Sequence, residues 1–158
     1  MLCVPSIKNF ASRRRQDLET TIEMMWIEII LKNKSILVAT IYLSTKSTIK
    51  VVKLFEKSVL NVIDKVKDND SILILGDCNM TDLKWKQSDN PFSKALDEDT
   101  LIPASSRFPD ILNSFDLKQY NVFPTCVESV LELVITDNLV IQVQLSEKAM
   151  TSTHRAHK

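Results

Sequence analysis

Glycine is almost absent from this sequence: Gly76 is the single glycine in 158 residues. Globular proteins carry about 7% glycine and use it where the backbone adopts a positive φ angle. We therefore predict that tight turns in this chain depend on asparagine and aspartate, which also tolerate that conformation. The same shortage excludes phosphate-binding loops built from several glycines.

The chain also lacks a charge excess and long apolar runs. Its 20 basic and 20 acidic residues cancel, so a nucleic-acid-binding surface would have to be a local patch. No run of about 18 apolar residues is present, which argues against a membrane span. The first residues lack the charged and apolar regions of a signal peptide. We therefore expect no membrane association.

Cysteine is too scarce and too scattered for a metal cluster. Cys3, Cys78 and Cys126 are odd in number and far apart, without the paired spacing of zinc sites. Such residues are typical of reduced thiols, and we expect an intracellular protein, nuclear or cytoplasmic. No serine or cysteine lies in a recognisable nucleophile motif either. Zinc sites and covalent hydrolases therefore find no support.

What the sequence does contain is a pattern of strands around an amphipathic helix. Alternating apolar residues predict strands over 23–30 and 35–43, joined as an antiparallel hairpin by a polar turn at 32–34. From Val52 to Val66, apolar residues recur at spacings of three and four, which predicts a helix lying on a sheet.

Shorter elements are expected in the second half of the chain. We predict a short helix over 92–96 and another from 109 to 115, which Pro109 can open because proline is favoured in the first turn of a helix. Residues 116–125 are predicted to be a loop or an edge strand. Strands are predicted over 130–136 and 139–145.

Residues 71–79, S-I-L-I-L-G-D-C-N, form the centre of the pattern. Four consecutive branched residues predict a strand buried on both faces, which we expect Gly76 to end. Asp77 and Asn79 follow at once, and open α/β sheets tend to place ligands at the carboxyl ends of their strands. An ordinary strand-to-loop turn is the alternative, since these residue types also form turns.

The order of these pieces resembles one family. G-D-C-N at 76–79 is followed by Trp85, then by Q-Y-N-V-F-P-T at 119–125 and L-E-L-V-I-T at 131–136. G-D-x-N alone is weak, but together these motifs resemble the endonuclease/exonuclease/phosphatase domain that non-LTR retrotransposons carry ahead of their reverse transcriptase. The resemblance runs over about residues 4–156.

The resemblance implies an α+β fold of the DNase I-like type, a partial four-layer α/β/β/α sandwich whose first strands are missing. We expect one such incomplete domain over residues 1–150, followed by a polar tail at 151–158. The implied activity is divalent-metal-dependent cleavage of a phosphodiester, with Mg²⁺ as cofactor and DNA as partner.

The resemblance also implies roles for four residues. Asp77 would polarise the attacking water, and Asn79 would hold the phosphoryl oxygens as negative charge develops. His154 is the nearest match to the family's phosphate-contacting histidine. Glu132 stands where the family has the aspartate that orients this histidine; the alternative is a strand residue facing solvent.

The chain departs from the family pattern at several positions. The family's early asparagine and metal-binding glutamate have no counterpart, because Glu19, Glu23 and Glu28 come too late. The metal ligands therefore remain unknown. Thr153 replaces an aspartate of the family, and Cys78 replaces a phenylalanine whose lost volume Met80 or Leu83 would have to fill.

Two alternatives to an active nuclease follow from these departures. One is a catalytically inactive DNA-binding remnant, which would use Arg13 to Arg15 and the lysines near Trp85. We expect the arginines to lie in a solvated loop, with a phosphate-contacting patch as the alternative. The other is a protein-interaction module or remnant that self-associates through an open sheet edge.

Overall fold

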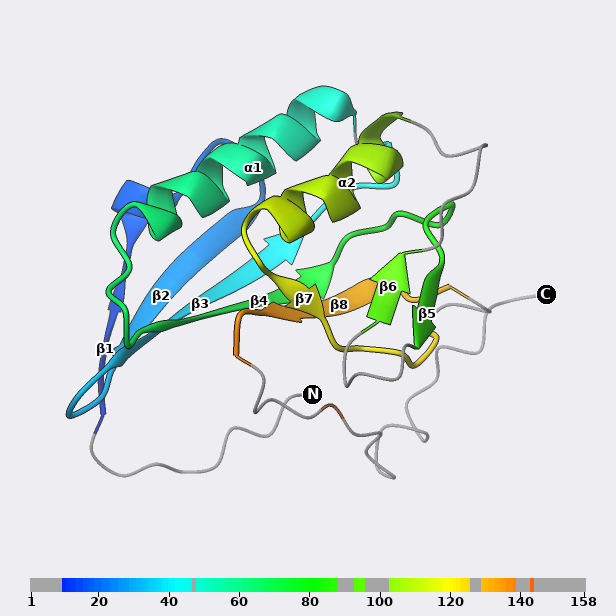
Figure 1. Ribbon diagram of the computed structural model, residues 1–158. Helices are drawn as coiled ribbons and strands as arrows, with labels where there is room; N and C mark the ends of the chain where they lie inside the picture. Colours follow the sequence, from blue (N-terminus) through cyan, green and yellow to red (C-terminus); the bar gives the residue numbers. More distant parts are fainter. Residues whose placement is uncertain are drawn as a thin grey trace, which may run out of the picture.

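The computed structural model describes residues 10–46, 48–87, 93–95, 103–125, 129–138 and 143. Within these residues, eight strands form one sheet and two helices cover one of its faces (Figure 1). The strand order is β1-β2-β3-β4-β8-β7-β6-β5. Because β3 and β4 are parallel and their other neighbours are antiparallel, this is a mixed sheet of the α+β class.

The strands are β1 (Ala11–Arg14), β2 (Met24–Ile30), β3 (Ser35–Tyr42), β4 (Ser71–Asp77), β5 (Trp85–Gln87), β6 (Ser93–Ala95), β7 (Lys118–Gln119) and β8 (Glu132–Thr136). The helices are α1 (Ile49–Ile63) and α2 (Pro103–Ser114), and a short 3-10 turn, η1 (Gln16–Leu18), precedes β2. None of the described helices is long and apolar enough to span a bilayer.

The hairpin and the first helix are confirmed. β2 and β3 pair in antiparallel register along their whole length, and α1 buries Val52, Phe55 and Val59 against the sheet. Alternation along β2 leaves Trp26 fully buried on the helix face, where its Nε1–H donates to Ser58 Oγ at 2.9 Å. The local periodicity was sufficient here because each element buries one continuous apolar face.

Two predicted elements of the second half are wrong. Residues 93–95 form the strand β6 rather than part of a helix. Pro109 lies inside α2, which begins at Pro103. An internal proline removes a helical hydrogen bond, but α2 buries Phe108 against α1, where its ring stacks on Phe55 at 5.0 Å. Tertiary packing outweighs local preference. The strand predicted over 139–145 lies outside the described residues, apart from residue 143.

The prediction that Gly76 ends its strand is also wrong. β4 continues through Asp77, because Gly76 pairs with Ile41 on one side and with Leu133 on the other. The glycine has φ +150°, and a Cβ there would overlap the Ile41 carbonyl. Positive φ angles in the described turns do fall to Asn79 and Asp116, as the scarcity of glycine predicted.

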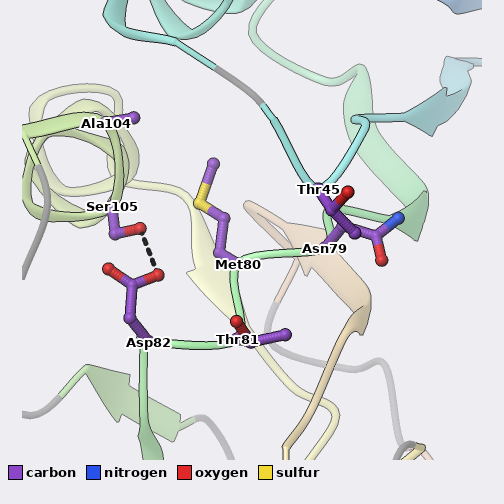
Figure 2. Close-up of a pocket in the computed structure, with 7 residues that line it drawn as sticks. All are labelled: Thr45, Asn79, Met80, Thr81, Asp82, Ala104 and Ser105. Atoms are coloured by element: carbon purple, nitrogen blue, oxygen red, sulfur yellow. Dashed lines mark hydrogen bonds between the residues drawn. The ribbon is translucent and has the colours of Figure 1, made fainter.

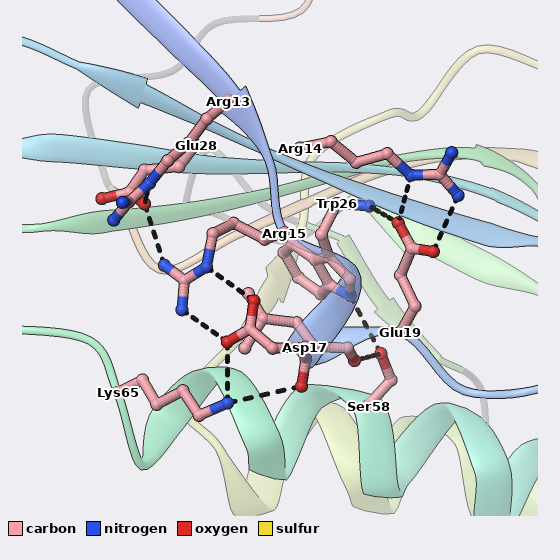
Figure 3. A network of polar contacts seen from close by, with 10 residues as sticks. Arg13, Arg14, Arg15, Asp17, Glu19, Trp26, Glu28, Ser58 and Lys65 are labelled. Carbon is pink, nitrogen blue, oxygen red and sulfur yellow. Dashed lines mark hydrogen bonds and ion pairs between the residues drawn. The ribbon is translucent and has the colours of Figure 1, made fainter.

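Arg13 and Arg14 are exposed, as predicted, but the arginine triplet lies in and just after an edge strand rather than in a loop. Arg13 lies in β1 and its Nε–H donates to Glu28 Oε2 at 2.8 Å. Arg15, just after the strand, donates from Nη1 to the same oxygen at 2.8 Å (Figure 3). The Glu28 side chain is only 12% exposed, so two guanidinium groups compensate one carboxylate that burial would otherwise disfavour.

The remaining charges of this cluster are paired as well. Arg14 makes two hydrogen bonds to Glu19, at 3.0 and 2.9 Å. Asp17 bridges the guanidinium of Arg15 and the ammonium of Lys65 on the loop after α1 (Figure 3). These ion pairs connect β1, β2 and the helix layer. Because the arginines are already paired with carboxylates of their own chain, they are poor candidates for binding phosphate.

Replacing Glu28 with glutamine is expected to destabilise the fold in a pH-dependent way. The Arg13 guanidinium lowers the pKa of Glu28 despite its burial. A lowered carboxyl pKa stabilises the folded state above the unfolded value of about 4.3, and this advantage is lost as the pH falls below it. We expect Glu28→Gln to lower the free energy of unfolding by about 2 kcal/mol at pH 7 and by much less at acidic pH.

Urea unfolding at pH 7 and pH 3 measures this difference. Glu23→Gln, which removes an exposed carboxylate just before the same strand, is the matched control and should change little. An equal loss for Glu28→Gln at both pH values would show that shape, rather than charge pairing, is what Glu28 contributes.

Candidate functional site

Two acidic residues lie directly opposite each other at the carboxyl end of β4. Asp77 pairs with Glu132 across β4 and β8. Cys78 N–H donates to Leu131 O at 2.9 Å, so residues 77 and 132 form a non-hydrogen-bonded pair, the position in which opposite side chains lie closest. The Asp77 side chain is half-buried and that of Glu132 is exposed. Like charges in this position repel, an arrangement that a bound cation would relieve.

Both carboxylates lie on the sheet face that the helices do not cover. Leu133 and Cys78, their neighbours in sequence, are buried in the core on the helix side. Because side chains alternate along a strand, Asp77 and Glu132 project to the other face. Glu132 thus faces solvent, which agrees with its alternative interpretation, and it also lies opposite Asp77, which the sequence did not predict.

Asn79 is fixed by the turn that follows β4. Its φ angle is 47°, its backbone N–H donates to Asp77 Oδ1 at 3.0 Å, and its Nδ2 donates to Leu43 O at 2.9 Å. An amide group has two N–H donors, so the bond to Leu43 uses half of this capacity. The short polar turn therefore places the carboxylate of Asp77 and the amide of Asn79 at one edge of the sheet.

A pocket of about 230 Å³ lies beside Asn79 (Figure 2). It is lined by Thr45, Asn79, Met80, Thr81, Asp82, Ala104 and Ser105. Ser105 Oγ–H donates to Asp82 Oδ1 at 2.7 Å, which places this carboxylate at the first turn of α2. A negative charge is favourable at a helix N-terminus. No sequence motif had indicated Asp82 or Ser105, because the loop and the helix that carry them meet only in the fold.

Cys78 belongs to the core rather than to the site. Its side chain is 1% exposed, and burial raises the pKa of its thiol strongly, so the thiol remains neutral. A neutral thiol is neither a nucleophile nor a metal ligand. Met80 and Leu83 are buried in the same core, and whether they fill the volume of the family's phenylalanine stays a prediction.

The carboxylate pair could supply part of the ligand set of a magnesium ion. Mg²⁺ prefers oxygen ligands, keeps several waters and is usually bound through one or two carboxylates plus substrate phosphate. Asp77 and Glu132 supply such a pair. In the part of the chain that the structure describes, no group of three histidine, cysteine, aspartate or glutamate side chains could hold a metal. The described donors therefore suit an ion completed by water and substrate, and not an ion caged by protein.

Comparisons with known proteins agree with this architecture. No family model matches the sequence, and no curated protein matches it. A solved structure that is similar is the endonuclease domain of TRAS1, a telomere-specific non-LTR retrotransposon, with a TM-score of 0.55 and 15% sequence identity. The match covers 80% of this chain and 55% of that chain. The two chains share a fold.

The predicted α+β class is therefore confirmed, and the fold resembles the DNase I-like fold of that endonuclease domain; the described residues form a single sheet with helices on one face, so the four-layer arrangement stays a prediction. The chain covers 55% of the neighbour's length. Of the predicted site residues, the structure brings together Asp77, Asn79 and Glu132. His154 lies outside the described residues, so the prediction that Glu132 orients this histidine stays a prediction.

Proposed function

We propose that this chain is a divalent-metal-dependent endonuclease domain of the non-LTR retrotransposon type, which hydrolyses a phosphodiester of DNA. The observation that carries the proposal is the pairing of Asp77 with Glu132, beside Asn79, at the carboxyl end of β4. The likeness in fold to a retrotransposon endonuclease domain supports the choice of reaction. DNA is then the partner, and phosphate and water are the groups that the site must handle.

In this proposal the chain's own residues divide the work. The Asp77 carboxylate accepts a hydrogen bond from the attacking water and orients it toward phosphorus. The hydrogen bond from Asn79 N–H to Asp77 Oδ1 fixes the carboxylate in place. The Asn79 side chain then donates to a phosphoryl oxygen, where negative charge grows during the reaction. His154 would contact the phosphate, with Glu132 orienting it.

Mg²⁺ would be held by Asp77 and Glu132 together with water and phosphate, and as a Lewis acid it would stabilise the charge on the phosphoryl group. The two carboxylates repel each other when no ion lies between them. Binding of Mg²⁺ would therefore stabilise the folded protein. Metal-dependent folding stability is therefore part of the proposal.

Relaxation of supercoiled plasmid by protein already shown to be folded tests the proposal. We expect nicking in millimolar Mg²⁺ and none in EDTA, with a rise in melting temperature when Mg²⁺ is added, because an ion that binds only the folded state stabilises it. Folded protein that leaves the plasmid supercoiled at every Mg²⁺ concentration would overturn the proposal.

The alternatives gain less from the structure. A DNA-binding remnant that uses Arg13 to Arg15 is disfavoured, because these arginines are paired with carboxylates. Edge pairing through β1 is disfavoured as well. The four residues of this edge strand are exposed and two of them, Arg13 and Arg14, are charged, and charged side chains protect a sheet edge from pairing with another chain. Salt-sensitive DNA binding without cleavage would nevertheless identify an inactive binder.

A further inference from the structure

Beside Glu132, side chains make the hydrogen bonds to the β8 backbone that a neighbouring strand would otherwise make. β7 pairs with β8 only at Lys118 and Gln119, so its backbone cannot bind the start of β8. Instead, Thr125 Oγ1 accepts the N–H groups of Leu131 and Glu132, at 3.0 and 3.2 Å. Asn121 Nδ2 donates to Glu132 O at 2.6 Å.

Both backbone groups of Glu132 are therefore held from the side away from β4. This is the side to which they must point, because residues 77 and 132 are the non-hydrogen-bonded pair of the β4–β8 ladder. Without Asn121 and Thr125, the N–H and C=O of Glu132 would lack these bonds, and the first residue of β8 would fray.

The side chains behind these bonds are buried and hydrogen-bonded to one another. Asn121 and Gln119 are 7% and 1% exposed. Gln119 Oε1 accepts Asn121 N–H at 2.6 Å, Gln119 Nε2 donates back to Asn121 O, and Asn121 Oδ1 accepts Phe123 N–H at 3.0 Å. Thr125 N–H donates to Ser129 O at 3.0 Å, which closes the loop before β8. Buried polar groups that are bonded in this way have one arrangement.

We infer that Asn121 and Thr125 are positioning residues, which hold the backbone of Glu132 so that its carboxylate stays opposite that of Asp77. The inference rests on the proposed function, since the pair matters only where it handles metal or phosphate. It assigns the side chains of Gln119, Asn121 and Thr125 to the reaction through Glu132, although none of them reaches the reacting atoms.

Thr125→Val and Thr125→Ser form the central test, since valine removes the accepting oxygen at nearly constant shape and serine keeps it. We expect the amides of Leu131 and Glu132 to exchange with solvent at least about tenfold faster in Thr125→Val, with Thr125→Ser close to wild type. The nicking rate should fall by about 10- to 100-fold in Thr125→Val, the effect expected of an ångström-scale displacement, and serine should restore it.

Thr136→Val is the matched control at the other end of β8. Thr136 is fully buried and donates from Oγ1 to Ile72 O at 2.6 Å, so its loss should lower the melting temperature and leave nicking unchanged. In a Glu132→Gln background, Thr125→Val should lower the rate by less than about threefold, because the two changes act through the same carboxylate.

Each outcome decides the inference. Unchanged exchange at residues 131 and 132 in Thr125→Val, or full nicking by that variant, overturns the positioning role while the nuclease proposal stands. Additive losses with Glu132→Gln overturn it too, because they indicate a general structural role. A folded wild-type protein that does not nick overturns the proposed function and with it the positioning role, a result recognised before any variant is made.

Discussion

Replacing Gly76 with alanine is expected to unfold the protein. Gly76 has φ +150°, a conformation that residues with a Cβ rarely adopt. The added Cβ would overlap the carbonyl oxygen of Ile41 and lie 2.8 Å from its carbonyl carbon. Ile41 is in β3 and its backbone cannot retreat without breaking the parallel ladder with β4. We expect a loss of at least about 4 kcal/mol, against a typical domain stability of about 5–15 kcal/mol.

Urea unfolding followed by circular dichroism measures this effect. Ala39→Gly is the matched control, because Ala39 is buried on β3 two residues from Ile41 and the exchange runs in the opposite direction. Its cost should be about 1 kcal/mol, from the flexibility of glycine in a strand. A Gly76→Ala protein with a near-normal urea midpoint would contradict the close approach of β3 and β4.

Asp77→Asn is expected to abolish nicking while leaving the protein folded. Asparagine keeps the Oδ1 atom that accepts the Asn79 N–H, so the turn after β4 should persist. It cannot act as a base toward water, and loss of a general base typically costs 10² to 10⁴ in rate. We expect a decrease of about 10³-fold in the nicking rate at saturating Mg²⁺.

The same substitution is expected to increase the stability of the protein, although it lowers the activity. Neutralising Asp77 removes its repulsion of Glu132, which should raise the free energy of unfolding by about 0.2–1 kcal/mol in EDTA. It should also remove most of the rise in melting temperature that Mg²⁺ produces in wild type. A loss of activity together with a gain of stability separates a functional carboxylate from a structural one.

Asp64→Asn is the control for both measurements, since Asp64 is an exposed carboxylate at the end of α1. It should leave the nicking rate and the Mg²⁺ response unchanged. Nicking that persists in Asp77→Asn would mean that a contaminating nuclease or another residue carries the reaction, and that Asp77 has a different task.

Elements whose signal is local could be predicted from the sequence. The β2–β3 hairpin and α1 followed from apolar periodicity, and the strand before Asp77 followed from its run of branched residues. The scarcity of glycine predicted that positive φ angles fall to asparagine and aspartate, and in the described residues Asn79 and Asp116 adopt them. In each case neighbouring residues in the chain contain the information, because one segment buries one face.

Elements that depend on distant partners could not be predicted. β1 pairs with β2, where Arg13 binds Glu28. β6 is a strand because it pairs with β5 on one side and β7 on the other. The helix α2 runs through Pro109 because it packs against α1. Their local sequences are compatible with several conformations, and the surrounding structure selects one.

The same division applies to the candidate site. The sequence by itself determined that an acid and an amide, Asp77 and Asn79, end a buried strand, because strand and turn preferences act over a few residues. Only the tertiary structure decided that Glu132 lies opposite Asp77, with its backbone N–H and C=O bound by the side chains of Thr125 and Asn121. Strand pairing across 55 positions in the chain depends on the whole sheet, since register is set by the burial of all its faces together.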